Sequence, residues 1–123
     1  MMTLPNMMAT LLAATSAAML LSAPAVCAQE TTVKGEVVDT ACFLHYNKSG
    51  EAHKACAEAC LKAGQDMGIY DDANDTLYVL LESKPGTDPN ALIKNYVAKK
   101  VEIVGTVAQK AKVQGIVVKE VKP

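Results

Sequence analysis

Apolar, mostly β-branched residues gather in three segments of the chain, and each segment carries a glycine two positions before a valine. The segments begin at Gly35 (GEVVD), Gly105 (GTVAQ) and Gly115 (GIVVK). Because β-branched residues flank each glycine, the pattern predicts three strands, at residues 31–41, 100–109 and 112–121. A glycine inside a strand allows the tight bend that a small barrel requires. The alternative is three ordinary strands in which the glycines have no structural role.

A fourth strand is predicted at residues 76–82 (TLYVLLE), where apolar residues occupy both faces. Two helices are expected between the strands. The first covers residues 50–63, with Ser49 as its N-cap and Gly64 just beyond its end. The second begins at Asp88, and its apolar stripe consists of Leu92, Ile93, Tyr96 and Val97.

The predicted order is strand, helix, strand, helix, strand, strand, which indicates a mainly β fold with two helices in the α+β class. A small barrel of the oligonucleotide/oligosaccharide-binding (OB) type, opened by a cysteine-bearing helix, accommodates this order best. A two-layer α+β sandwich is the alternative. Residues 29–123 are expected to form one domain. Its predicted core includes Val37, Leu77, Val79, Ile103, Val107 and Val117.

Residues 1–28 have the features of a signal peptide. An apolar run at 11–21 is followed by a polar and small-residue stretch ending in Val26-Cys27-Ala28, which suits cleavage after Ala28. The run is short for a membrane span. We therefore expect a periplasmic or secreted protein that is not transmembrane. Lipidation of Cys27 is the competing interpretation.

The charge composition argues against a nucleic-acid partner. The twelve basic residues are all lysines, thirteen acidic residues nearly balance them, and tryptophan is absent. Surfaces that bind nucleic acid usually carry an excess of basic residues, with arginine prominent, and aromatic side chains on which bases stack. We expect the partner to be a metal ion, with another exported protein as a further candidate.

Export makes the cysteine count informative. If Cys27 leaves with the signal peptide, three cysteines remain, at positions 42, 56 and 60. An odd number of thiols in an oxidising compartment requires metal ligation, an intermolecular bond, or one disulfide with a thiol left over.

The cysteines share the chain with a histidine at helical spacing. His53, Cys56 and Cys60 are related by i, i+3 and i+7, so a helix places them along one face. Cys42 follows the first strand, and folding that strand end against the helix brings the four together. Three thiolates and one imidazole form a tetrahedral set for zinc, and the same soft donors suit Cu(I). Asp39 and His45 are alternative fourth ligands or orienting groups.

Three other interpretations remain open. A disulfide from Cys42 to Cys56 or Cys60 would give a disulfide-stabilised module that binds a protein or small ligand. A Cys56–Cys60 disulfide is disfavoured within a helix, since the i, i+4 β-carbons are too far apart. Cys56 and Cys60 could instead be small core residues of an alanine-rich helix. A thiol-redox protein is the third, but the C-x-x-C motif is missing. No catalytic motif is recognisable, so we expect a protein that is not an enzyme.

The segment GEVVDTACFL and the later H-x-x-C-x-x-x-C spacing resemble a group of small exported bacterial proteins with an OB-like fold. The matching positions are Asp39, Cys42, His53, Cys56 and Cys60. The likeness covers most of residues 29–123, and the cysteine–histidine spacing is its specific part. It implies the fold and the site rather than a reaction.

Overall fold

The computed structural model describes residues 29–123; the predicted signal peptide at 1–28 lies outside the described residues. The strands are β1 (Glu30–Asp39), β2 (Met67–Asp71), β3 (Thr76–Leu81), β4 (Lys100–Lys110) and β5 (Val113–Lys122). The helices are α1 (Thr40–Tyr46) and α2 (Lys54–Lys62), with a 3₁₀ turn at Glu51–His53. The mainly β fold with two helices that the sequence predicts is confirmed.

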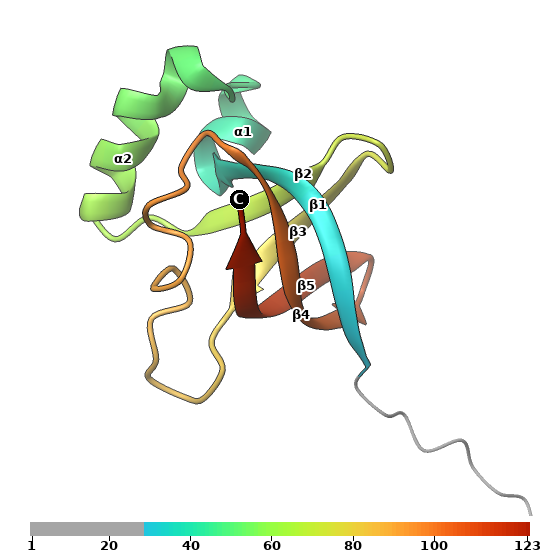
Figure 1. Cartoon of the computed structure of the whole chain (residues 1–123). Coiled ribbons are helices and arrows are strands. Elements are labelled where there is room, and N and C mark those ends of the chain that lie inside the picture. Colours follow the sequence, from blue (N-terminus) through green and yellow to red (C-terminus); the bar gives the residue numbers. More distant parts are fainter. Residues whose placement is uncertain (1–28) are drawn as a thin grey trace, which may run out of the picture.

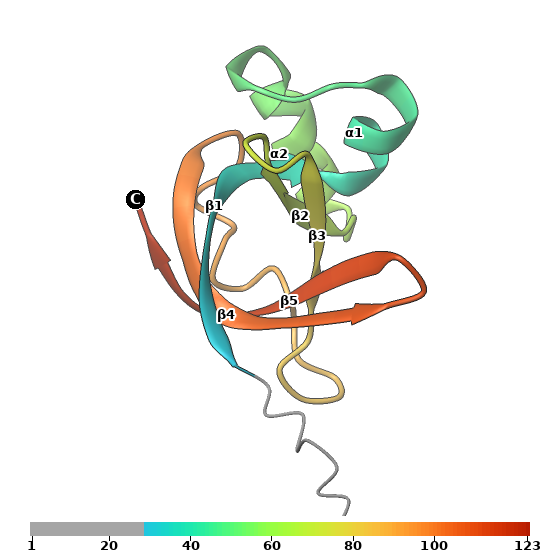
Figure 2. The same ribbon diagram turned by 90° about the vertical axis from the view of Figure 1, so that its right-hand side faces the viewer.

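The strands form a closed barrel in the order β1-β2-β3-β5-β4, and β4 pairs back with β1. All neighbours are antiparallel except β3 and β5, which are parallel. Figures 1 and 2 show α1 and α2 together at one end of this barrel, in the connection between β1 and β2. The cysteine-bearing segment therefore extends from the barrel without interrupting the ring of strands.

Two of the strand glycines lie where backbones come very close. β1 pairs with β4 through Glu36 and with β2 from Glu36 onward, so it changes partner beside Gly35. A β-carbon at Gly35 would lie 2.5 Å from the carbonyl oxygen of Tyr70. Gly105 adjoins the register shift between β4 and β5, and a β-carbon there would overlap the carbonyl oxygen of Val117. Only glycine fits either close approach without movement of the neighbouring strand.

The core fills the barrel and extends beneath the helices and the β3–β4 connection. Its buried apolar residues form one cluster: Val33, Val37, Ala57, Met67, Ile69, Leu80, Ile93, Val97, Val101, Ile103 and Ile116. Val37 and Ile103 are fully buried as predicted, and the half-buried Val107 packs against the cluster.

The predicted core faces of β3 and β5 are wrong by one residue. Tyr78 and Leu80, rather than Leu77 and Val79, contribute to the core from β3. In β5 the corresponding residues are Ile116 and Val118 rather than Val117. Apolar residues occupy both faces of these strands, so alternation in the sequence cannot tell one face from the other.

Two local boundaries also need correction. The first strand ends at Asp39 rather than residue 41, because α1 begins at Thr40. The predicted helix at 50–63 begins as a 3₁₀ turn capped by Gly50 rather than Ser49. Its end is as predicted: Gly64 adopts a φ of +87°, and the Gln65 N–H donates to the Cys60 carbonyl at 2.9 Å.

The second predicted helix, from Asp88 onward, is a series of turns. Its hydrogen bonds are mostly of the i, i+3 kind, such as Ile93 N–H to Asn90 O and Tyr96 N–H to Ile93 O. The segment then becomes extended, and Val37 pairs with it through Ala98 N–H and Lys99 O. This pairing with β1 competes with a regular helix, while Ile93 and Val97 still reach the core.

Asn90 anchors this connection to the start of β2. Its side chain is buried, its Oδ1 accepts from Met67 N–H at 3.2 Å, and its Nδ2 donates to Gln65 O at 3.4 Å. Asn90→Ala leaves the buried Met67 amide unsatisfied, so we expect a loss of about 1–3 kcal/mol in urea unfolding. The exposed Asn95→Ala is the control, expected within about 0.5 kcal/mol of the parent protein. Equal stability of the two variants would contradict the anchoring role.

Candidate metal centre

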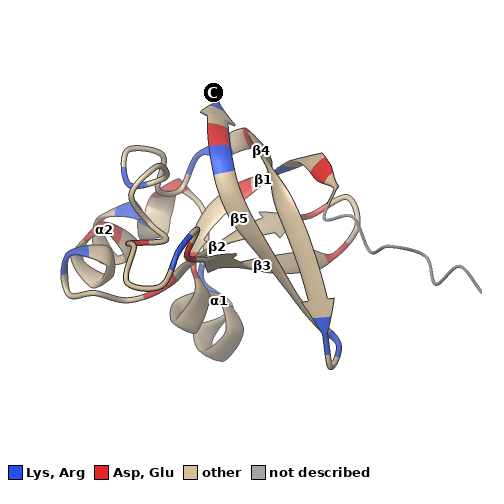
Figure 3. Cartoon of the chain, turned by 90° about the horizontal axis from the view of Figure 1, so that it is seen from below, with Lys and Arg blue, Asp and Glu red and all other residues tan. Residues whose placement is uncertain are grey.

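Helix α1 fixes the position of Cys42. Asp39 ends β1 and caps α1, because its Oδ1 accepts from the Cys42 N–H at 3.0 Å. Asn47 ends the helix in the left-handed conformation, with a φ of 53°. No residue of α1 is buried, and none is a lysine, arginine, aspartate or glutamate (Figure 3). The ring of Phe43 lies 4.5 Å from that of Tyr70, which joins α1 to β2.

Helix α2 supplies the other cysteines. Cys56 and Cys60 lie one turn apart on α2, and His53 is the last residue of the 3₁₀ turn that precedes it. Ala57, between the two cysteines, is the one buried residue of α2. The small residue lets the helix lie close to the barrel, with the cysteine side chains at the boundary between the helices.

The donor atoms fall into two compact groups that share Cys42. One contains Cys42, His53 and Cys56, and the other contains Asp39, Cys42 and Cys60; within each group all ligand atoms lie within 4.8 Å of one another. The structure thus brings together every position of the D-x-x-C and H-x-x-C-x-x-x-C pattern. Each group is close enough to hold a metal ion.

His45 belongs to neither group. It is exposed on α1, with its ring packed edge-on against Tyr46 at a centroid distance of 4.4 Å. Asp39, by contrast, lies beside the thiols. The sequence signal for this position of Asp39 is the D-x-x-C spacing. An aspartate three residues before Cys42 can cap a helix that contains the cysteine.

The imidazole of His53 has an unmet bonding capacity. Its Nε2 is buried and has no hydrogen-bond partner among the described residues. Buried polar nitrogens in proteins are nearly always paired with protein, water or a ligand. Because His53 is grouped with two thiols, its unpaired ring nitrogen is available as a metal ligand together with them.

The Asp39 carboxylate dominates the electrostatics of the thiols. Burial raises the pKa of Asp39, but hydrogen bonds from the Cys42 N–H and from the thiols of Cys60 and Cys42 outweigh it, leaving this pKa below its usual value. The hydrogen bond to Asp39, together with burial and nearby negative charge, raises the pKa of Cys60 to about 12. Burial and then Asp39 raise the pKa of Cys42. Without a cation these two thiols stay protonated and are poor nucleophiles.

All three cysteines of residues 29–123 are free thiols in the structure. Cys42 Sγ lies within 4.8 Å of both Cys56 Sγ and Cys60 Sγ, whereas no group unites Cys56 with Cys60. A small side-chain movement would therefore allow a disulfide between Cys42 and either Cys56 or Cys60, but not between Cys56 and Cys60.

The site is open to solvent on one side. Cys56 is exposed. A pocket of about 380 Å³ lies against His53, between the end of α1 and the 3₁₀ turn, and is lined by Asn47, Lys48, Ser49, Ala52 and His53. An ion could enter or leave here without opening the barrel.

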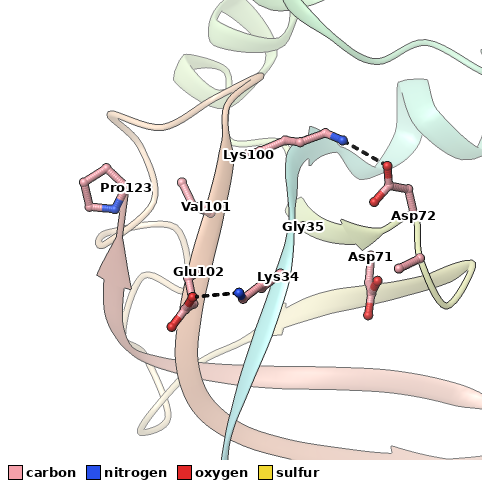
Figure 4. Close-up of a pocket in the computed structure, with 9 residues that line it drawn as sticks. Lys34, Gly35, Asp71, Asp72, Lys100, Val101, Glu102 and Pro123 are labelled. Atoms are coloured by element: carbon pink, nitrogen blue, oxygen red, sulfur yellow. Dashed lines mark hydrogen bonds and ion pairs between the residues drawn. The ribbon is translucent and has the colours of Figure 1, made fainter.

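A second pocket lies away from the cysteines, where β1, β4 and the β2–β3 turn meet. It has a volume of about 330 Å³, and its charged residues pair with each other: Lys34 with Glu102 at 3.5 Å and Lys100 with Asp72 at 3.0 Å (Figure 4). Both lysines and two of the acidic residues of this pocket are already paired. The pocket therefore has fewer free polar groups for a ligand than the thiol–imidazole cluster.

Within residues 29–123, no helix is long and apolar enough to cross a membrane. Comparison with known proteins finds no matching family model, no matching curated protein and no matching solved structure. The case for a function therefore depends on the site itself.

Proposed function

We propose that this chain is an exported, periplasmic metal-binding protein, a member of the small OB-like group that its cysteine pattern resembles. Its first ion, zinc(II) or copper(I), is bound by Cys42, His53 and Cys56. Cys60 supplies a fourth donor when a single ion is present, since Cys60 Sγ lies within 4.8 Å of Cys42 Sγ. The observation that carries the proposal is the buried, unpaired Nε2 of His53 on a residue grouped with two thiols.

The donor chemistry supports a soft or borderline ion. Two thiolates and an imidazole favour zinc or Cu(I) over calcium or magnesium, which prefer oxygen ligands. Ligand atoms around zinc lie about 3.4–3.8 Å apart, given bonds of about 2.0–2.3 Å. The observed limit of 4.8 Å requires only small side-chain movements to reach that geometry.

The position of the site supports holding and transfer of an ion more than a purely structural role. The buried core takes one alanine from α2 and nothing from α1, so the barrel has its own core without the cysteines. The exposed Cys56 and the pocket beside His53 leave the ion accessible to exchange.

The experiment that tests the proposal is native mass spectrometry of freshly isolated protein, with thiols counted before and after a chelator. We expect a bound ion that shields the thiols, and the chelator should release both the ion and full thiol reactivity. The disulfide-stabilised binding module predicts a different result. Two cysteines would then stay unreactive after chelation and become reactive only after reduction.

His53→Ala provides a second test, because no disulfide requires this histidine. We expect the affinity for the first ion to fall by more than the roughly 10–100-fold that follows loss of an outer-shell partner. Competition with a chromophoric chelator measures the change. The matched control is His45→Ala, which removes the other, exposed histidine and should leave the affinity unchanged. Unchanged affinity in His53→Ala would remove the imidazole from the site.

A further inference from the structure

The five donors are not arranged around one point. Cys60 is grouped with Asp39 and Cys42, while His53 and Cys56 are grouped with Cys42 on its other side. Among residues 29–123, no group of four of these donors meets the same distance limit. A single tetrahedral ion would leave Asp39 outside its ligand set. The arrangement instead provides two three-donor sites with one sulfur in common.

Asp39 supplies an independent indication of a cation in the second group. The residue is only 1% exposed, and its Oδ2 is buried with no nitrogen or oxygen atom as a hydrogen-bond partner; the groups beside the carboxylate are the thiols of Cys60 and Cys42. None of the four ion pairs among the described residues includes it. A buried carboxylate is normally paired with a cation or bound to a metal. Capping of α1 uses Oδ1 alone, so it does not account for the burial of Oδ2 beside two thiols.

We propose that Asp39, Cys42 and Cys60 bind a second divalent ion and that the Cys42 thiolate bridges the two ions. This inference rests on the proposed function, since the first ion occupies the Cys42, His53 and Cys56 group. A thiolate sulfur has enough lone pairs to bind two metals. Each thiol releases its proton to solvent as its metal–sulfur bond forms, and no change of oxidation state is involved.

Charge and donor type identify the class of ion. Three thiolates and the Asp39 carboxylate carry four negative charges, and two divalent ions balance them, whereas one ion leaves a net negative charge beside the barrel. Carboxylate together with thiolate suits zinc(II) better than Cu(I), which selects soft sulfur donors. The second site is therefore specific for a zinc-like divalent ion.

The test counts zinc ions on the reduced full chain carrying Cys27→Ser, so that only the three described cysteines contribute thiols. After excess zinc and removal of weakly held ions, native mass spectrometry should show two ions per chain. Asp39→Asn and Cys60→Ser should each retain one ion, and so should Cys56→Ser, which leaves the second group intact. Asparagine is also a good N-cap, so Asp39→Asn preserves α1.

The matched control for Asp39→Asn is Asp71→Asn. Asp71 is also buried, but both its carboxylate oxygens accept from Asn74 in the β2–β3 turn, so its variant should still bind two ions. A parent protein that binds one zinc ion would overturn the second site and leave the proposed function standing. Two ions in Asp39→Asn would exclude the carboxylate as a ligand and also overturn the second site. A protein that binds no zinc or copper would overturn both proposals.

Discussion

Replacing Cys42 by serine is expected to abolish tight metal binding altogether, a larger loss than any other single substitution in the site should cause. Cys42 is the donor that the two groups share, so its removal leaves at most two donors in each. A serine hydroxyl is a hard, weakly acidic ligand and does not replace a thiolate for zinc or Cu(I). Cys56→Ser and Cys60→Ser each disrupt only one group and should retain measurable binding.

The same series tests whether the donors act as a unit. Once Cys42 is absent, adding Cys56→Ser or His53→Ala should cost little further affinity, because residues in one ligand shell are strongly non-additive. Native mass spectrometry and chelator competition measure the losses. Full metal content in Cys42→Ser would mean that the ion is bound elsewhere.

Circular dichroism of Cys42→Ser separates a lost ligand from a lost fold. Serine retains the backbone N–H that Asp39 Oδ1 accepts, so the cap of α1 is preserved. α1 contributes no buried residue, and the barrel core does not include Cys42. We therefore expect an intact barrel with no metal ion.

The elements that could be predicted are those with strong local patterns. β1, β4 and β5 follow segments rich in β-branched residues, and β3 follows a run of apolar residues. The end of α2 follows from Gly64, whose left-handed φ of +87° suits glycine. The closure of the strands into a barrel agrees with the predicted architecture. These features depend on backbone preferences that act within a few residues.

β2 and α1 were missed because their signals are short. β2 has five residues (MGIYD) and draws its stability from pairing with β1 and β3 rather than from its own pattern. α1 has only seven residues, none of them buried, so it shows no apolar stripe. The signals that could have revealed α1 are Asp39 as an N-cap and Asn47 as a left-handed C-cap.

The sequence indicates which donor residues lie close together, but not how they divide into two groups around Cys42. Helical spacing indicates that His53, Cys56 and Cys60 share a face, yet His53 lies in a 3₁₀ turn rather than in the α-helix of the two cysteines, so α-helical spacing does not fix where its imidazole lies. Whether Cys60 lies nearer to His53 or to Asp39 depends on how α2 sits on the barrel. That placement follows from tertiary packing through Ala57, which sequence spacing does not contain.

The largest stability loss is expected for Ile103→Ala, at the centre of the barrel. Ile103 is fully buried in β4, where it pairs with Val33 of β1 and Val121 of β5. Truncating it removes apolar contacts and leaves a cavity that paired strands on both sides cannot collapse to fill. Substitutions of this kind cost about 2–5 kcal/mol. Small domains have about 5–15 kcal/mol in total, so much of the fold's stability would be lost.

Urea unfolding of the reduced, metal-free proteins is the appropriate measurement, because a bound ion would add stability and obscure the difference. Val113→Ala is the control: Val113 is also an apolar residue of the β4–β5 pair, but it is 56% exposed, so its variant should stay within about 0.5 kcal/mol of the parent. A similar small loss in Ile103→Ala would show that the barrel interior does not carry the stability. The helices, and with them the metal ligands, would then have to stabilise the barrel, and a metal-free protein with an independent fold would no longer be expected.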